Sequence, residues 1–247
     1  MTNDALLKEQ QHVIDAFTDL APNYEKKMDS ELHLFWGWSY QKLIETLLES
    51  CKDLHPKRML DLATGKLVIP RAVLSMYPSI QQLIGLDITY RMLHLGKANL
   101  TEKSPIGLLC ASALEIPISS KSFDLITCAL ATHHMDVKKL LLEIYRTLDL
   151  KGTVLIVDVG ASKTWLNPVV RFCIQILAFL YFLFRENAAR AWAEAEALPN
   201  IRTSEDWRNE LKAVNFSEIQ ITKLKSRRLF IPDPILIQAK RTGDLKK

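Results

Sequence analysis

Two aspartates follow apolar runs at positions where a parallel sheet binds its ligands. Asp61 lies near the end of one run and precedes the small-residue turn Ala63–Gly65, while Asp87 ends the run Leu83–Asp87. A strand, a tight turn and a helix in this order present backbone N–H groups and a helix N-terminus to a ligand. We therefore expect residues 61–65 to contact a nucleotide-like cofactor.

Asp87 is the candidate for binding a ribose. It follows Asp61 by 26 positions, close to the ~20 residues that separate the turn from the ribose carboxylate in dinucleotide folds. A carboxylate at the end of the second strand can accept hydrogen bonds from both ribose hydroxyls. The alternative is that Asp87 is only a favourable negative charge at a helix N-terminus. The chain has no G-x-G-x-x-G motif, which argues against a nicotinamide cofactor.

Two adjacent histidines, His133 and His134, lie at the end of a fourth apolar run. Imidazole titrates near neutral pH, so either ring is a candidate general base. The alternative is that one histidine is structural and the other exposed. A metal site formed with Asp136 is disfavoured because adjacent side chains diverge, and we expect no metal. Asp158 faces the same end of the sheet and could orient a substrate or cap the following loop.

Strands and helices alternate along the part of the chain that must position these residues. Apolar runs predict strands within 58–67, 82–87, 106–111, 123–130 and 153–158, and two more near 218–224 and 230–239. Helical periodicity covers 5–20, 34–54, 89–100, 136–148 and 204–214. This alternation predicts a parallel sheet with right-handed crossovers. We expect one domain, 1–247, with a helical lid (1–55), a cofactor-binding core (56–160), a helical insertion (161–200) and a C-terminal helix with strands (201–247).

Composition excludes several classes of function. The net charge is +4 with acids and bases intermixed, which is too mild to indicate a nucleic-acid partner. The four cysteines lie far apart and form no C-x-x-C pair. Together with an N-terminus that lacks a signal peptide, they predict reduced thiols and a cytoplasmic location.

Residues 165–184 are almost entirely apolar. The longest uninterrupted part, Ile176–Phe184, has nine residues, fewer than the ~20 that a membrane-spanning helix needs. We therefore expect no transmembrane segment. The stretch could form a hydrophobic substrate pocket, a subunit interface, a shallow membrane contact or a buried helix over the core. Glu186 and Arg190 follow it at i,i+4 spacing, which predicts a helical ion pair.

Several motifs in order resemble those of the class I S-adenosylmethionine-dependent methyltransferases, in particular the ubiquinone/menaquinone C-methyltransferase branch. The motifs are the turn at 60–65, the ribose motif at 85–89 with Met92, the adenine-contacting turn at 111–117, the histidine-bearing strand at 122–134, and the turn into the fifth strand at 146–158. A lid signature at 17–24 precedes them. The resemblance covers most of residues 12–160.

This resemblance implies a doubly wound, mostly parallel seven-stranded sheet of the methyltransferase-like Rossmann type, with a helical lid and an insertion after the fifth strand. It implies S-adenosyl-L-methionine as cofactor and a hydrophobic small molecule as substrate. The cofactor contacts that it implies are Tyr24, Asp61, Ala63, Gly65, Asp87, Ile88, Met92, Ser112, Ala113 and Leu114. His133 and His134 are the catalytic candidates.

Two residues depart from the family pattern. Leu67 replaces the last glycine of the first motif, and Ser112 stands where the family usually has an aspartate. The expected function is methyl transfer to a carbon, oxygen or nitrogen of the substrate. The alternatives are a degenerate member that serves as a binding or partner subunit, and a relative that uses the same pocket for a rearrangement without methyl transfer.

Overall fold

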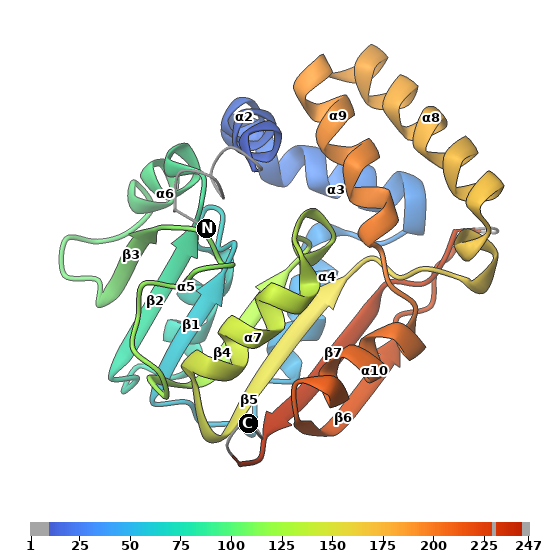
Figure 1. Cartoon of the computed structure of the whole chain (residues 1–247). Coiled ribbons are helices and arrows are strands. Elements are labelled where there is room, and N and C mark those ends of the chain that lie inside the picture. Colours follow the sequence, from blue (N-terminus) through green and yellow to red (C-terminus); the bar gives the residue numbers. More distant parts are fainter. Residues whose placement is uncertain (1–9, 229–230, 244–247) are drawn as a thin grey trace.

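The computed structural model describes residues 10–228 and 231–243 and is built around one seven-stranded sheet (Figure 1). The strands are β1 (Arg58–Leu62), β2 (Gln82–Asp87), β3 (Ile106–Cys110), β4 (Phe123–Ala129), β5 (Leu148–Asp158), β6 (Phe216–Lys223) and β7 (Ile235–Arg241). Their order is β3-β2-β1-β4-β5-β7-β6. Strands β1 to β5 are parallel to one another, and β7 is antiparallel to both β5 and β6. The predicted doubly wound, mostly parallel sheet is confirmed.

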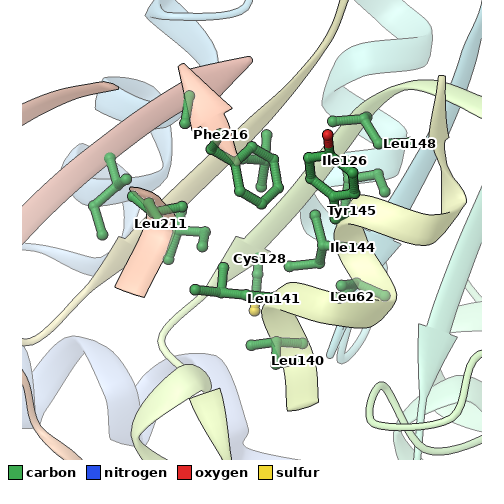
Figure 2. Packing of buried hydrophobic residues seen from close by; sticks show 14 of the residues in the cluster. Leu62, Ile126, Cys128, Leu140, Leu141, Ile144, Tyr145, Leu148, Leu211 and Phe216 are labelled. Atoms are coloured by element: carbon green, nitrogen blue, oxygen red, sulfur yellow. The ribbon is translucent and has the colours of Figure 1, made fainter. Parts of the chain in front are cut away.

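Helices cover both faces of the sheet because alternate strand residues point to opposite sides. Leu60 and Leu62 pack toward α7 (Val137–Thr147) and α10 (Ser204–Ala213), whereas Met59 packs toward the other face. Figure 2 shows part of the first cluster, where the rings of Tyr145 and Phe216 meet edge to face at 5.1 Å. The second face is covered by α4 (Tyr40–Glu49), α5 (Val68–Met76) and α6 (Tyr90–Lys97).

The N-terminal helices differ from the prediction. In place of one helix over 34–54, the chain forms α3 (Tyr24–Trp36) and α4, separated at Gly37. Gly37 has a φ of 70°, and the Ser39 side chain accepts the Lys42 N–H to start α4. A left-handed glycine after one helix and a serine N-cap before the next are local signals that apolar periodicity alone does not carry. The preceding helix α2 spans Gln11–Leu20, and the short η1 (Ala21–Asn23) joins it to α3. Residues 5–9 of the predicted first helix lie outside the described residues.

Three strand boundaries also shift. Strand β5 begins at Leu148 rather than at 153, through an irregular pairing with β4. Strand β6 covers Phe216–Lys223 rather than 218–224. Strand β7 begins at Ile235, directly after Pro234, because proline has no N–H to donate to a ladder. Its predicted first residue, 230, lies outside the described residues.

The predicted insertion forms η3 (Lys163–Leu166), α8 (Pro168–Arg185), α9 (Ala188–Ala197) and η4 (Leu198–Asn200). Together with α2 and α3 it lies beyond the carboxyl ends of the parallel strands (Figure 1). The predicted Glu186–Arg190 helical pair is wrong, because Glu186 ends α8 and Asn187 caps α9, so the two residues are not on one helix. Glu186 instead pairs with Lys27 at 3.2 Å.

Helix α8 has 18 residues, twice the length of the apolar run visible in the sequence. By length and composition it is long and apolar enough to cross a membrane, and it is the one such helix among the described residues.

Candidate active site

The turn after β1 is fixed by Asp61. Its carboxylate accepts hydrogen bonds from the hydroxyls of Thr64 at 2.6 Å and of Thr127, on β4, at 2.5 Å. The side chain is buried, and burial raises the pKa of Asp61 to about 7 against the opposing effect of the two hydroxyls. Asp61 does not line the cavity described below. Its predicted contact with cofactor remains a prediction, and its geometry is that of a residue that holds the turn.

The backbone of the turn keeps a glycine-like conformation at two residues that are not glycine. Ala63 and Leu67 have φ values of 50° and 65°, and Gly65 between them has 55°. A left-handed conformation costs a residue with a Cβ about 1–2 kcal/mol. The turn therefore holds two residues that carry a Cβ in a conformation that glycine adopts more easily.

The Leu67 side chain is fully buried because two other residues leave room for it. A Cβ atom at Gly85 on β2 would lie 2.6 Å from Leu67 Cδ2, and one at Gly96 on α6 would lie 3.0 Å from Leu67 Cγ. Leu67 thus fills the space between β2 and α6 that a side chain at position 85 or 96 would need. The surroundings have adapted to the departure from the family motif.

Asp87, at the end of β2, connects this turn to the next one. Its Oδ2 accepts the Gly65 N–H at 2.8 Å, and its Oδ1 accepts the Thr89 N–H at 2.8 Å. Burial raises the pKa of Asp87 to about 6, and the two backbone N–H donors act in the opposite direction. Each oxygen retains a lone pair for a ligand hydroxyl, since a carboxylate oxygen can accept more than one hydrogen bond.

A cavity opens beside Asp87 at the carboxyl ends of the strands. Seven of the predicted site residues line it: Tyr24, Ala63, Gly65, Asp87, Ile88, Met92 and His134. Helix α2 supplies Val13 and Phe17, and the loop after β4 supplies Leu130 and Met135. Only about 50 Å³ of this cavity is wide enough for a water molecule, whereas ligand pockets have roughly 300–1,000 Å³. The cavity in this structure is thus smaller than a nucleoside-sized group needs.

The predicted adenine contacts lie behind a lid residue. Ser112 is buried, and its hydroxyl donates to Gln10 Oε1 at 2.8 Å and accepts the Leu114 N–H at 3.2 Å. Gln10 lines the cavity, whereas Ser112, Ala113 and Leu114 do not. No pattern in the sequence marks Gln10, because it precedes α2 without a motif. The adenine role of these three residues remains a prediction.

His133 forms a close pair with Asp158, the last residue of β5. Its Nδ1 lies 2.7 Å from Asp158 Oδ1, and its Nε2 makes no hydrogen bond with any residue that the structure describes. The carboxylate also accepts the N–H groups of Thr132 and Val159 at 2.7 Å each, and the Thr132 hydroxyl. Sequence reasoning placed His133 and Asp158 at one end of the sheet, and the structure brings them into contact.

His133 and Asp158 shift each other's pKa. Burial lowers the pKa of His133, but the Asp158 carboxylate outweighs it and the pKa lies above its ordinary value. Burial likewise raises the pKa of Asp158, but His133 and the hydrogen bonds hold it below its ordinary value. A carboxylate that fixes one ring nitrogen of a histidine leaves the other oriented and more basic. This geometry suits His133 to accept a proton at Nε2, but His133 does not itself line the cavity, which the adjacent His134 does, with the two ring centres 4.2 Å apart.

His134 belongs to a buried cluster that adjoins the His133–Asp158 pair, with the two histidine ring centres 4.2 Å apart. Its Nε2 lies 3.5 Å from Glu194 on α9, and its ring meets that of Phe17 edge to face at 5.3 Å. Burial and the neighbouring His133 lower the pKa of His134. Its Nδ1 is buried and has no hydrogen-bond partner. His134 is therefore neutral near pH 7 and faces the cavity.

Arg190 joins this cluster to the lid. It is 2% exposed and pairs with Glu194 at 3.0 Å and with Glu31 on α3 at 3.1 Å. Its guanidinium also lies 5.0 Å from the ring centre of Phe17 and 5.2 Å from that of Phe182. Arg190 thus ties the insertion to both lid helices.

The pKa values of the two carboxyl groups in this cluster are shifted in opposite directions. Burial raises the pKa of Glu31. The pKa of Glu194 is lowered, because Arg190 and His134 outweigh its burial. Sequence reasoning missed Glu31 and Glu194. The i,i+4 spacing of Arg190 and Glu194 was a signal that could have found one of these pairs.

His133, His134 and Glu194 offer ligand atoms that lie within 4.8 Å of one another, so they form a possible metal site. Arg190 contacts the same Glu194 carboxylate at 3.0 Å, and its positive charge opposes a cation there. The expectation that the site holds no metal remains a prediction.

Comparisons with known proteins show which kind of domain these residues resemble. A protein-family model described as a methyltransferase domain matches residues 60–156, which run from the turn at Asp61 to the strand that ends at Asp158. The chain is similar to a methyltransferase domain over these residues, which supports the predicted S-adenosylmethionine-dependent methyltransferase. The predicted enzyme class and cofactor are thereby confirmed.

Curated relatives support the methyltransferase assignment. The uncharacterised methyltransferase YcgJ of Bacillus subtilis is 33% identical over 123 residues, which are 49% of this chain and 46% of that protein. The chain thus matches less than half the length of YcgJ. A demethylmenaquinone methyltransferase of Porphyromonas gingivalis is 26% identical over 213 residues, 82% of this chain and 83% of that protein.

Solved structures show the same fold. The crystal structure of YcgJ has a TM-score of 0.60 and 19% identity, covering 83% of this methyltransferase and all of that chain. Phosphoethanolamine N-methyltransferase 2 of Haemonchus contortus, in complex with S-adenosyl-L-methionine, has a TM-score of 0.60 and 17% identity. The match covers 83% of this chain and 53% of the Haemonchus contortus chain.

The residues present fit S-adenosylmethionine. Asp87 offers acceptors for ribose hydroxyls beside Gly65, where no Cβ narrows the approach, and the ring of Tyr24 lies over this glycine. Ile88 and Met92 supply an apolar wall. Leu67 points away from the cavity and does not obstruct it.

Proposed function

We propose that this methyltransferase acts on a hydrophobic small molecule of the quinol type. The observation that carries the proposal is the single cavity in which the cofactor-side residues Gly65 and Asp87 meet apolar lid residues and His134. Its lining beyond the turn is mostly apolar: Val13, Phe17, Ile88, Met92, Leu130 and Met135. The similarity to a demethylmenaquinone methyltransferase supports a quinol acceptor, and the C-methyltransferase names of further relatives favour a ring carbon as the methylated atom.

The bound cofactor supplies an activated methyl group, so the protein's contribution is to position the acceptor, exclude water and remove a proton. His133, oriented by Asp158, is the proposed base: its Nε2 takes the proton that the acceptor loses when the new bond to the methyl group forms. His134 is held neutral by burial and is proposed to orient the acceptor. Phe17 and Arg190 hold the lid over the reacting atoms.

The proposal is tested with the purified chain and S-adenosylmethionine that carries a deuterated methyl group. A demethylated menaquinol analogue in detergent micelles is the acceptor, and mass spectrometry follows transfer of the label. We expect labelled product with the quinol and little with a polar amine of similar size. Transfer to the amine but not to the quinol would overturn the substrate class.

Cofactor binding is measured separately by calorimetric titration with S-adenosylmethionine and with its demethylated product. Binding without transfer to any acceptor would favour a non-catalytic binding subunit. Failure to bind either compound at millimolar concentration would overturn methyl transfer itself. The cytoplasmic location and the single-domain organisation remain predictions.

A further inference from the structure

Helix α8 presents an apolar face that no described residue covers. The face follows helical spacing along four turns, and its large side chains are 37–82% exposed: Val169, Phe172, Ile176, Leu177, Leu180, Leu183 and Phe184. Leu166 on η3 and Trp192 on α9 extend it at its margins. A contiguous exposed apolar surface of this length marks an interaction site.

The opposite side of α8 packs against the rest of the protein. Gln175 Nε2 donates to the carbonyl of Ala195 on α9, and Phe179 packs against Trp192 at 4.8 Å. Tyr181 meets Phe35 of α3 at 5.5 Å. Because α8 is anchored along one side and continues into the domain at both ends, it lies on a surface rather than crossing a membrane alone.

The charges near the exposed face of α8 indicate the kind of surface that this face binds. Residues 161–185 contain Lys163, Arg171 and Arg185 and no aspartate or glutamate. Two of these cations bracket a helix about 27 Å long, and Glu186, the first acid after them, is engaged by Lys27. An apolar face with aromatic and leucine side chains and basic residues at its ends is the pattern of helices that lie in the interface of an anionic bilayer.

A second copy of the chain is a poorer match for this face. In an antiparallel pair of α8 helices, Lys163 of one copy would lie near Arg185 of the other, and a parallel pair would place each cation beside its own equivalent. Residues 161–185 provide no acid to separate these like charges. Anionic lipid headgroups complement the two exposed cations at the ends, Lys163 and Arg185, whereas Arg171 donates to the Trp165 carbonyl on the anchored side.

We propose that the exposed face of α8 docks this protein on an anionic lipid bilayer, with its apolar side chains inserted below the headgroups. Helix α9 packs against α8, and the lid helix α2 packs against α9, so docking places α9 between the membrane-bound helix and the lid of the active site. The inference rests on α8 and does not depend on the proposed acceptor.

The test is vesicle flotation of the full chain with phosphatidylcholine vesicles, with and without phosphatidylglycerol. We expect flotation with the phosphatidylglycerol-containing vesicles that decreases as salt is raised. The variant Phe172→Asp/Leu177→Asp, which changes two exposed residues, should lower the vesicle partition coefficient at least about tenfold. Leu150→Asp is the matched control: Leu150 is 49% exposed near the start of β5, at the far end of the sheet (Figure 1), and should float as the parent does.

A charge variant, Lys163→Glu/Arg185→Glu, should remove the preference for phosphatidylglycerol while leaving the apolar face intact. Circular dichroism and cofactor titration establish that each variant is folded. Trp192 reports insertion through a blue shift of its emission, and this shift should disappear in Trp192→Phe. Absence of flotation with either vesicle would overturn the proposal. So would a dimer in solution that Phe172→Asp/Leu177→Asp dissociates while the parent fails to float.

Discussion

The side chain of Leu67 occupies the space that a side chain at Gly85 would need. A Cβ at Gly85 would lie 2.6 Å from Leu67 Cδ2 and 2.9 Å from both Oγ1 and Cγ2 of Thr64. The glycine that the family motif places in the turn is missing, and a glycine on the neighbouring strand provides the room. The turn after β1 therefore accommodates a leucine at this position.

The first prediction is that Gly85→Ala destabilises the fold by about 1–3 kcal/mol, because the added methyl group overpacks the contact with Leu67. Gly107→Ala is the matched control on β3, where the nearest atom to a new Cβ is 3.5 Å away. Urea denaturation measures both. In a Leu67→Ala background the cost of Gly85→Ala should fall, with a coupling of at least about 0.5 kcal/mol. Equal costs in both backgrounds would show that the two residues do not share this space.

The second prediction concerns Asp87. Asp87→Asn should weaken S-adenosylmethionine binding at least tenfold, on the order of 1.4 kcal/mol, because one charged acceptor for the ribose hydroxyls is lost. In the parent, affinity should decline as the pH is lowered through about 6, where the carboxylate becomes protonated. Calorimetric titration measures both effects. Asp53→Asn, at an exposed site, is the control. Unchanged affinity of Asp87→Asn, in a variant that unfolds at the parent's temperature, would remove the ribose assignment.

The third prediction concerns the pair of His133 and Asp158. A base must be neutral, so the rate should fall on the acid side as His133 becomes protonated at its raised pKa. Asp158→Asn removes the negative charge that favours the imidazolium. The acid limb should therefore move to lower pH by about one unit, a change of ~1.4 kcal/mol in the interaction, and the plateau rate should fall. Rate–pH profiles of the parent, Asp158→Asn and His133→Ala decide this. Full activity of His133→Ala across the range would exclude His133 as the base.

The same pair makes a fourth prediction about stability. The raised pKa of His133 means that the folded state holds its proton more tightly than the unfolded state. Its stabilising contribution is present below the ordinary histidine pKa of about 6.5 and is lost as the pH rises through the higher folded value. The stability advantage of the parent over His133→Ala should therefore shrink between neutral and alkaline pH, as followed by urea denaturation. An advantage that grows with pH would contradict the ion pair.

The fifth prediction concerns Arg190. Replacing it with methionine leaves the carboxylates of Glu31 and Glu194 buried without their cation, which should cost about 3–5 kcal/mol of unfolding free energy. Adding Glu31→Gln and Glu194→Gln to that variant should recover part of the loss. Lys42→Met is the control, since the Lys42–Glu45 pair is exposed and should contribute less than about 1 kcal/mol. A loss in Arg190→Met no larger than in the control would show that the cluster does not fasten the lid.

The amino-acid sequence by itself determined the alternation of strands and helices, the ligand-binding end of the sheet and the positions of Asp87 and His133. These features follow from apolar patterns and from residues at strand ends, both of which can be recognised within a short stretch of sequence. Only the tertiary structure brought Glu31 on α3, and Arg190 and Glu194 on α9, to His134, because these elements lie far apart in the sequence. It also decided that Gly85 makes room for Leu67 and that α8 is exposed along one face. Such contacts depend on how elements pack, and packing is not encoded in the periodicity of any one segment.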